Sequence, residues 1–296
     1  MSVIERQPRL FRGGNAALFR SAVSVLSVLS ASLWGRMAAA SEFDDLGERS
    51  TAQLRILDRA IVLHPRDSKG FVDRAEFFGK ANFEDKAFAD FKRALELQPT
   101  DSDAYFKRGE FEMQLDDYRA ALSDYLKAAQ FAPDAAKGSP LRHAGRAQIK
   151  LRAFADGVKT LTSSLAYEVP TAKHLTLKER AICYVALHKY KEAIADVNAM
   201  GYGGPVHSDE ALAIRAEAEF QLGQTQAAID DLTLALRNVK KKPANLERLV
   251  FSSDTPTYYK LRARCYTKLG KDDLAAADLK HAKGAEKDSL EFAPFR

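Results

Sequence analysis

Two cysteines and six histidines are the side chains that could ligate a metal or act as nucleophiles, and their spacing favours neither role. Cys183 and Cys265 each lie two residues after a small residue, where corresponding segments carry alanine, so we interpret both as buried apolar side chains. No histidine stands at ligand spacing from another ligand, and no HExxH, CxxC, GxSxG or glycine-rich phosphate loop occurs. The sequence therefore predicts no catalytic residue, no metal site and no cofactor.

Arginines and aspartates recur together along the chain, and they could either bind an anionic partner or stabilise the fold. The recurring combinations are Arg74 with Asp90, Arg108 with Asp124, Arg180 with Asp196, Arg215 with Asp231, and Arg262 with Asp278. One segment has lost both members together and carries Ala144 and Thr160 instead. Partly buried arginines and carboxylates need each other to avoid an unpaired charge. We therefore predict ion pairs within single repeating units, with a row of arginine ligands as the alternative.

These residues sit in short helices, because apolar residues beyond residue 50 recur at helical spacing between turn signals. Pairs of small residues, twelve positions apart, mark where two helices must approach closely. They are Ala75 and Ala87, Gly109 and Ala121, Gly145 and Gly157, Ala181 and Ala193, Ala216 and Ala228, and Ala263 and Ala275. Each pair indicates one helical hairpin.

Larger side chains lie one helical turn from these small residues and should share their buried face. Four positions before the first small residue stand Phe71, Tyr105, Leu141, Leu177, Leu212 and Tyr259; four after the second stand Phe91, Tyr125, Leu161, Val197, Leu232 and Leu279. Proline follows at Pro65, Pro99, Pro133, Pro170 and Pro205, where it ends the second helix of a hairpin.

This pattern resembles the tetratricopeptide repeat, a helix-turn-helix unit of about 34 residues with small residues at fixed places and a closing proline. The resemblance implies an all-α fold, an α-solenoid of stacked helical hairpins forming a superhelix of about six repeats. We place the repeats at 68–101, 102–135, 138–171, 174–207, 209–242 and 256–289, within a solenoid at 68–289 that carries an insertion at 243–255. A partial repeat at 41–67 precedes them, and a tail at 290–296 follows. Glu112, Gln148 and Glu219 depart from the family pattern, which usually has an aromatic residue there.

First helices of such a solenoid line a concave groove, so the resemblance implies a scaffold or adaptor that holds a peptide or protein. The residues expected to face that partner are Phe106, Glu110, Met113, Arg142, Arg146, Ile149, Lys150, Lys178, Ile182, Val185, Glu217, Phe220, Lys260 and Arg264. Arg142, Arg146 and Lys150 form a cationic stretch, and guanidinium groups match carboxylates well, so an acidic or C-terminal segment is the expected ligand. The alternative is a solvated face whose apolar members fill gaps between helices.

The first forty residues suggest export. An uncharged run at 21–35 is short for a bilayer span and suits a signal-peptide core, and Ala38 and Ala40 give a cleavage signal. We expect residues 1–40 to be a signal peptide cut after Ala40, with the mature protein in a bacterial periplasm. An uncleaved membrane anchor and a mitochondrial transit peptide are the alternatives, the second because the stretch is rich in Arg and Ser.

The charge balance bears on the class of partner. Four of the five net positive charges arise in the first forty residues, which hold Arg6, Arg9, Arg12, Arg20 and Arg36 against Glu5. The remainder is close to neutral and lacks the clustered lysines and arginines of a nucleic-acid binder. We therefore expect a protein partner and no nucleic acid, with membrane contact only through an uncleaved leader. A membrane-anchored assembly factor and an organelle-targeted adaptor are the alternatives, and an enzyme subunit is disfavoured.

Overall fold

The computed structural model describes residues 47–200, 208–241 and 255–291, and the chain divides into two compact units, Met1–Pro65 and Arg66–Arg296. The described part of the first unit is one helix, α2 (Glu48–Leu63). The leader at 1–40 and the insertion at 243–255, apart from Thr255, lie outside the described residues. Within the described ranges the chain forms thirteen α-helices, one short 3₁₀ turn (Asp134–Ala136) and no strand.

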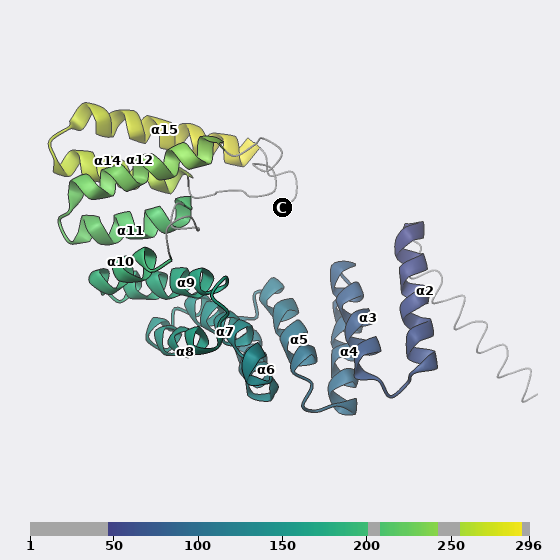
Figure 1. Ribbon diagram of the computed structural model, residues 1–296. Coiled ribbons are helices and arrows are strands. Elements are labelled where there is room, and N and C mark those ends of the chain that lie inside the picture. Colours follow the sequence, from purple (N-terminus) through teal and green to yellow (C-terminus); the bar gives the residue numbers. More distant parts are fainter. Residues whose placement is uncertain (1–46, 201–207, 242–254, 292–296) are drawn as a thin grey trace, which may run out of the picture. The chain divides into compact units, whose positions relative to one another are not determined.

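The second unit consists of helical hairpins, coloured from blue to yellow in Figure 1. Its hairpins are α3 (Ser68–Lys80) with α4 (Glu84–Leu97), α5 (Ser102–Gln114) with α6 (Tyr118–Phe131), α7 (Gly138–Lys150) with α8 (Phe154–Tyr167), α9 (Lys173–Ala186) with α10 (Tyr190–Asn198), α11 (Asp209–Gln221) with α12 (Thr225–Lys241), and α14 (Thr255–Lys268) with α15 (Asp272–Glu291). The two helices of each hairpin pack on each other, and each second helix contacts the first helix of the next hairpin. The predicted all-α solenoid of six repeats is confirmed.

The helix crossings bury the small residues that the sequence pattern singles out. The alanines at these crossings are between 0% and 4% exposed. A Cβ atom on Gly145 would lie 2.4 Å from a methyl carbon of Leu161, and a Cβ atom on Gly109 would lie 3.0 Å from the Tyr125 ring. The hairpins therefore close only because these positions carry almost no side chain.

Most of the larger side chains next to the crossings are buried in the core, whereas Tyr105 and Leu141 are half-buried and Leu279, at the end of the unit, is exposed. Phe91, Tyr125, Leu161, Val197 and Leu232 are at most 1% exposed. Leu279, the corresponding residue of α15, is 48% exposed, so its expected burial is wrong. The reason is that no described hairpin follows α15 to cover this face, whereas every earlier second helix is covered by the next hairpin.

The turn inside each hairpin contains one residue in the left-handed region of φ. These residues are Asn82, Asp116, Arg152, His188, Gly223 and Gly270, with φ between 58° and 81°. Only glycine adopts this region without a steric penalty, and asparagine and aspartate tolerate it better than other residues. Arg152 and His188 therefore store strain that their hairpins must offset.

Candidate functional site

The arginine and aspartate pairs lie inside single hairpins, as predicted. In all five, the arginine Nε donates to Oδ2 and Nη2 donates to Oδ1 of the aspartate, at distances between 2.5 and 2.9 Å. The aspartate side chains are at most 13% exposed. These bidentate bonds occupy two donors of each guanidinium and both carboxylate oxygens, so the pairs hold the first and second helices in register. The alternative, a row of arginine ligands for an anionic partner, has no support here.

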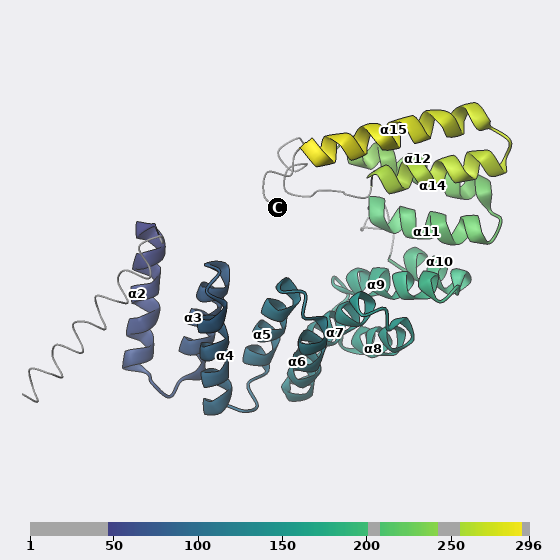
Figure 2. The same ribbon diagram turned by 180° about the vertical axis from the view of Figure 1, so that it is seen from behind.

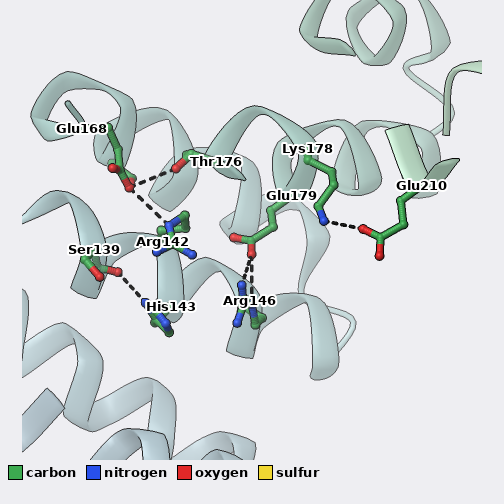
Figure 3. Close-up of polar contacts among 10 residues, drawn as sticks. Ser139, Arg142, His143, Arg146, Glu168, Thr176, Lys178, Glu179 and Glu210 are labelled. Carbon is green, nitrogen blue, oxygen red and sulfur yellow. Dashed lines mark hydrogen bonds and ion pairs between the residues drawn. The ribbon is translucent and has the colours of Figure 1, made fainter. Parts of the chain in front are cut away.

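Two of the three cations expected on α7, Arg142 and Arg146, lie against carboxylates from neighbouring elements, as Figure 3 shows. Arg142 Nε donates to Glu168 Oε1 at 3.3 Å, and the Arg142 side chain is only 12% exposed. Arg146 donates from Nε and Nη2 to Glu179 Oε1, at 2.9 and 2.7 Å. These two guanidiniums are thus neutralised within the fold, and Arg146, at 44%, is the more accessible.

Several further groove residues also have contacts within the protein. Lys178 donates to Glu210 on the next first helix (Figure 3). Phe106 and Met113 are partly buried against the core of α6 and α7. Lys150 lies over the Tyr118 ring, at 6.0 Å from its centre. Of the predicted groove residues, the exposed ones are Lys150, Lys260 and Arg264, and the half-buried ones are Phe106, Glu110, Met113, Arg142, Arg146, Ile149, Lys178, Ile182, Val185, Glu217 and Phe220.

An open cavity of about 470 Å³ lies between the first helices α9, α11 and α14. In the view of Figure 2, α11 lies between the other two, and it contacts both. The lining residues are Ile182, Val185, Glu210, Ala213, Ile214, Glu217, Thr257, Tyr258 and Leu261. The structure thus brings three predicted groove residues, Ile182, Val185 and Glu217, into one hollow. Concave apolar sites of this size with a few polar groups are typical of ligand pockets.

Three residues that help to line this cavity, Ile214, Tyr258 and Leu261, were not predicted from the sequence to face the groove. Leu261, for example, directly follows Lys260, which the resemblance does assign to the groove. The apolar character of the three was the available signal, but apolar residues on these helices also form the core. Only the separation of three packed helices leaves these particular side chains facing a hollow.

Phe220 of α11 and two cations of α14 lie together at one side of the groove. The Arg264 guanidinium carbon and the Lys268 Nζ each lie 4.8 Å from the centre of the Phe220 ring. Arg264 Nη1 also lies 3.5 Å from Glu217 Oε2, which connects this cluster to the cavity lining. Cations over an aromatic face are attracted by the ring electrons and are held in place by that contact.

Glu112, Glu179 and Glu219 are buried, and the Oε2 atom of each has no hydrogen-bond partner within the described part of the chain. Burial raises the pKa of Glu112 and of Glu219 to about 7, and nearby aspartate charges add to the rise. Burial also raises the pKa of Glu179, although Arg146 opposes the rise. Glu112 and Glu219 occupy the places where the family usually has an aromatic residue, so their solvation is poor.

Both cysteines and His143 are poorly placed to act as nucleophiles or proton carriers, because they are buried or partly buried. Burial raises the pKa of the Cys183 thiol to about 12 and that of Cys265 to about 11, and both thiols are free and buried. Burial lowers the pKa of His143 to about 4, and its ring packs between Phe106 and Tyr125. In the described ranges, no group of three or more metal-ligating side chains comes together. Among the described helices, none combines the length and apolarity of a membrane span.

Comparison with known proteins agrees with this architecture. Residues 102–134 match the family model of the tetratricopeptide repeat. The chain is similar in structure to YrrB, described as a TPR protein with an unusual peptide-binding site, at 18% identity and a TM-score of 0.53, over 65% of this chain and 95% of that one.

Two further solved structures are similar. PilW, described as a widely conserved type IV pilus biogenesis factor, is 16% identical, with a TM-score of 0.57 over 77% of this chain and 95% of that one. MamA from Desulfovibrio magneticus RS-1 is 13% identical, with a TM-score of 0.52 over 63% and 96%. No curated protein matches the sequence. At these identities the structural likeness extends to the fold alone.

Proposed function

We propose that this chain, a tetratricopeptide repeat protein, is a scaffold that binds a segment of a partner polypeptide in the cavity between α9, α11 and α14. The fold is typically a non-catalytic scaffold for protein interaction. The observation that carries the proposal is the apolar hollow of about 470 Å³, which three successive first helices line. Ile182, Val185 and Leu261 would contact an apolar side chain of the ligand, and burial of that side chain would supply about 1.5 to 3 kcal/mol.

The YrrB description supports a peptide ligand as one use of this fold. The polar members of the lining, Glu210, Glu217 and Thr257, stand at intervals between the apolar ones. The two carboxylates can accept hydrogen bonds from the N–H groups of an extended backbone, and the Thr257 hydroxyl can donate to a backbone carbonyl, as polar groups do in other ligand pockets. A peptide satisfies both features at once, because its side chains are apolar in part and its backbone is polar throughout.

A peptide library displayed on phage, selected against the full chain, tests this proposal. Ala213→Phe places a ring in the hollow, whereas Ala227→Phe places the same ring on an exposed position of α12. We expect selected peptides to lose at least about tenfold in affinity for the first variant and to keep their affinity for the second. Circular dichroism would confirm that both variants fold. Selection of no peptide, or equal binding to both variants, would overturn the proposal.

We further propose that the protein works in a bacterial cell envelope after export. The support is the uncharged run at 21–35 followed by Ala38 and Ala40. Expression of the full chain in a Gram-negative host, followed by N-terminal sequencing of the periplasmic protein, tests this. Ser41 as the first residue is the expected result. A retained Met1 in a membrane fraction that resists carbonate would instead indicate the anchored assembly factor, and a retained Met1 in the cytosol would refute export.

A further inference from the structure

The cations along the groove differ in how fully carboxylates of the same chain neutralise them. Arg142 and Arg146 of α7 lie 3.3 and 2.7 Å from the oxygens of buried glutamates, and Lys178 of α9 donates to Glu210. Charges that are paired in this way offer little to a ligand, since a new anion would have to displace an existing partner. Arg142, Arg146 and Lys178 are therefore poor partners for an acidic group of a ligand.

Two cations of the first helix α14 are less fully neutralised. Arg264 and Lys268 are one helical turn apart, so they share one face of α14, and both are exposed. The Arg264 guanidinium is 54% exposed and has a longer contact, 3.5 Å, with Glu217. Within the described part of the chain, Lys268 forms no ion pair, and its ammonium contacts only the ring and the carbonyl oxygen of Phe220. The positive charge at this end of the groove thus remains available.

The Phe220 ring fixes both cations without neutralising them. A cation over a ring keeps its formal charge and its outer hydrogen-bond donors, while the contact reduces the number of rotamers that the long side chain samples. Arg264 and Lys268 are therefore partly preorganised, which lowers the entropy cost of holding an anion there. An incoming carboxylate would find donors already in place next to an apolar hollow.

We propose, on the basis of the proposed function, that the bound segment carries an acidic side chain one to three residues from the apolar side chain that enters the cavity. Leu261 lines the cavity on α14, and Arg264 and Lys268 follow it by one and two turns, which is about 5 and 10 Å along the helix. An extended peptide advances about 3.3 Å per residue, so these distances correspond to about one to three residues. The carboxylate contacts Arg264 and Lys268, and the apolar side chain contacts Ile182, Val185 and Leu261.

Fluorescence anisotropy of the full chain with synthetic peptides tests this inference. The peptides are twelve residues long, amidated at the C-terminus, with one central Phe or Leu in a Gly and Ser background. Asp, Gln or Lys occupies the three positions on either side of the central residue, in separate peptides. The protein variants are Arg264→Glu/Lys268→Glu and a matched control, Lys271→Glu/Lys280→Glu, whose lysines are exposed outside the groove and which changes the net charge equally.

We expect the Asp peptides to bind about tenfold more tightly than the Lys peptides, with a difference that shrinks at high salt. Arg264→Glu/Lys268→Glu should reverse this order, and the control should keep it. Equal binding of Asp, Gln and Lys peptides, all weakened by Ala213→Phe, would overturn the acidic preference and leave the cavity as the binding site. Failure of every peptide to bind would overturn the proposed function as well. Tighter binding of a peptide whose only carboxylate is a free C-terminus would assign the contact to a chain end instead.

Discussion

Replacement of Glu112 by glutamine should stabilise the protein, and the gain should depend on pH. The Glu112 side chain is 10% exposed and lies 3.9 Å from Arg108, whose closer bonds go to Asp124. Its Oε2 atom has no hydrogen-bond partner. An ionised carboxylate at this position is therefore poorly solvated, and burial raises its pKa from 4.5 to about 7.

The sign and size of the effect follow from the two pKa values. Between pH 4.5 and 7 the unfolded chain loses the Glu112 proton while the folded protein keeps it, so the free energy of unfolding falls as pH rises. Above pH 7 the free energy of unfolding has fallen by its full amount, about 3 kcal/mol at 1.36 kcal/mol per pKa unit. Glu112→Gln removes this penalty. The variant should therefore be more stable than the parent protein by about 3 kcal/mol at pH 8 and by less than about 1 kcal/mol at pH 5.

Urea unfolding followed by circular dichroism at pH 5 and pH 8 measures both gains. The third hairpin provides a matched control, because Gln148 occupies the corresponding buried position. Gln148→Glu should lower the free energy of unfolding, and by more at pH 8 than at pH 5. If Glu112→Gln and the parent protein show the same dependence on pH, then Glu112 ionises in the folded protein without cost, and the reasoning from burial is refuted.

Three further predictions concern the hairpins. Arg108→Ala and Asp124→Ala should each lower the free energy of unfolding by about 3 kcal/mol, because each single change leaves a partly buried charge unpaired. The double variant should therefore lose less than the sum of the two. A double-mutant cycle by urea unfolding measures this, and strict additivity would contradict it. Gly145→Ala should lower the free energy of unfolding by about 1 to 3 kcal/mol, because its Cβ atom would overlap Leu161. The Gly145→Ala/Leu161→Ala double variant should lose less than the sum of the two single changes, because the added methyl group then fills part of the cavity. A neutral Gly145→Ala in thermal unfolding would argue against close helix contact. Arg152→Gly should stabilise by about 1 kcal/mol, since φ at this turn is 59°; a lower unfolding temperature would show that the arginine side chain outweighs the strain.

The hairpins were predictable because their signals are local and repeated. Ala75 and Ala87, like the five pairs that follow them, are close in sequence and lie in one hairpin, so the spacing alone indicates where helices cross. The loss of Arg and Asp together at Ala144 and Thr160 was sufficient to place each ion pair inside one hairpin. A solenoid makes such inferences possible, because each repeat contacts only its neighbours.

The candidate site depended on contacts that do not recur at a fixed spacing in the sequence. Arg142 and Arg146 stand out as a cationic stretch in the sequence, but their partners are Glu168 and Glu179, one from the end of the second helix and one from the next hairpin. The exposed Leu279 likewise reflects the end of the stack rather than its own helix.

The sequence by itself determined the secondary structure, the hairpin register and the buried ion pairs. Only the tertiary structure decided which groove cations are neutralised and where three first helices separate enough to leave a cavity. The physical reason is that burial and charge pairing depend on side chains brought together from several helices. Phe220 and Lys268 illustrate this, because a long stretch of chain separates them in sequence although their side chains are in contact.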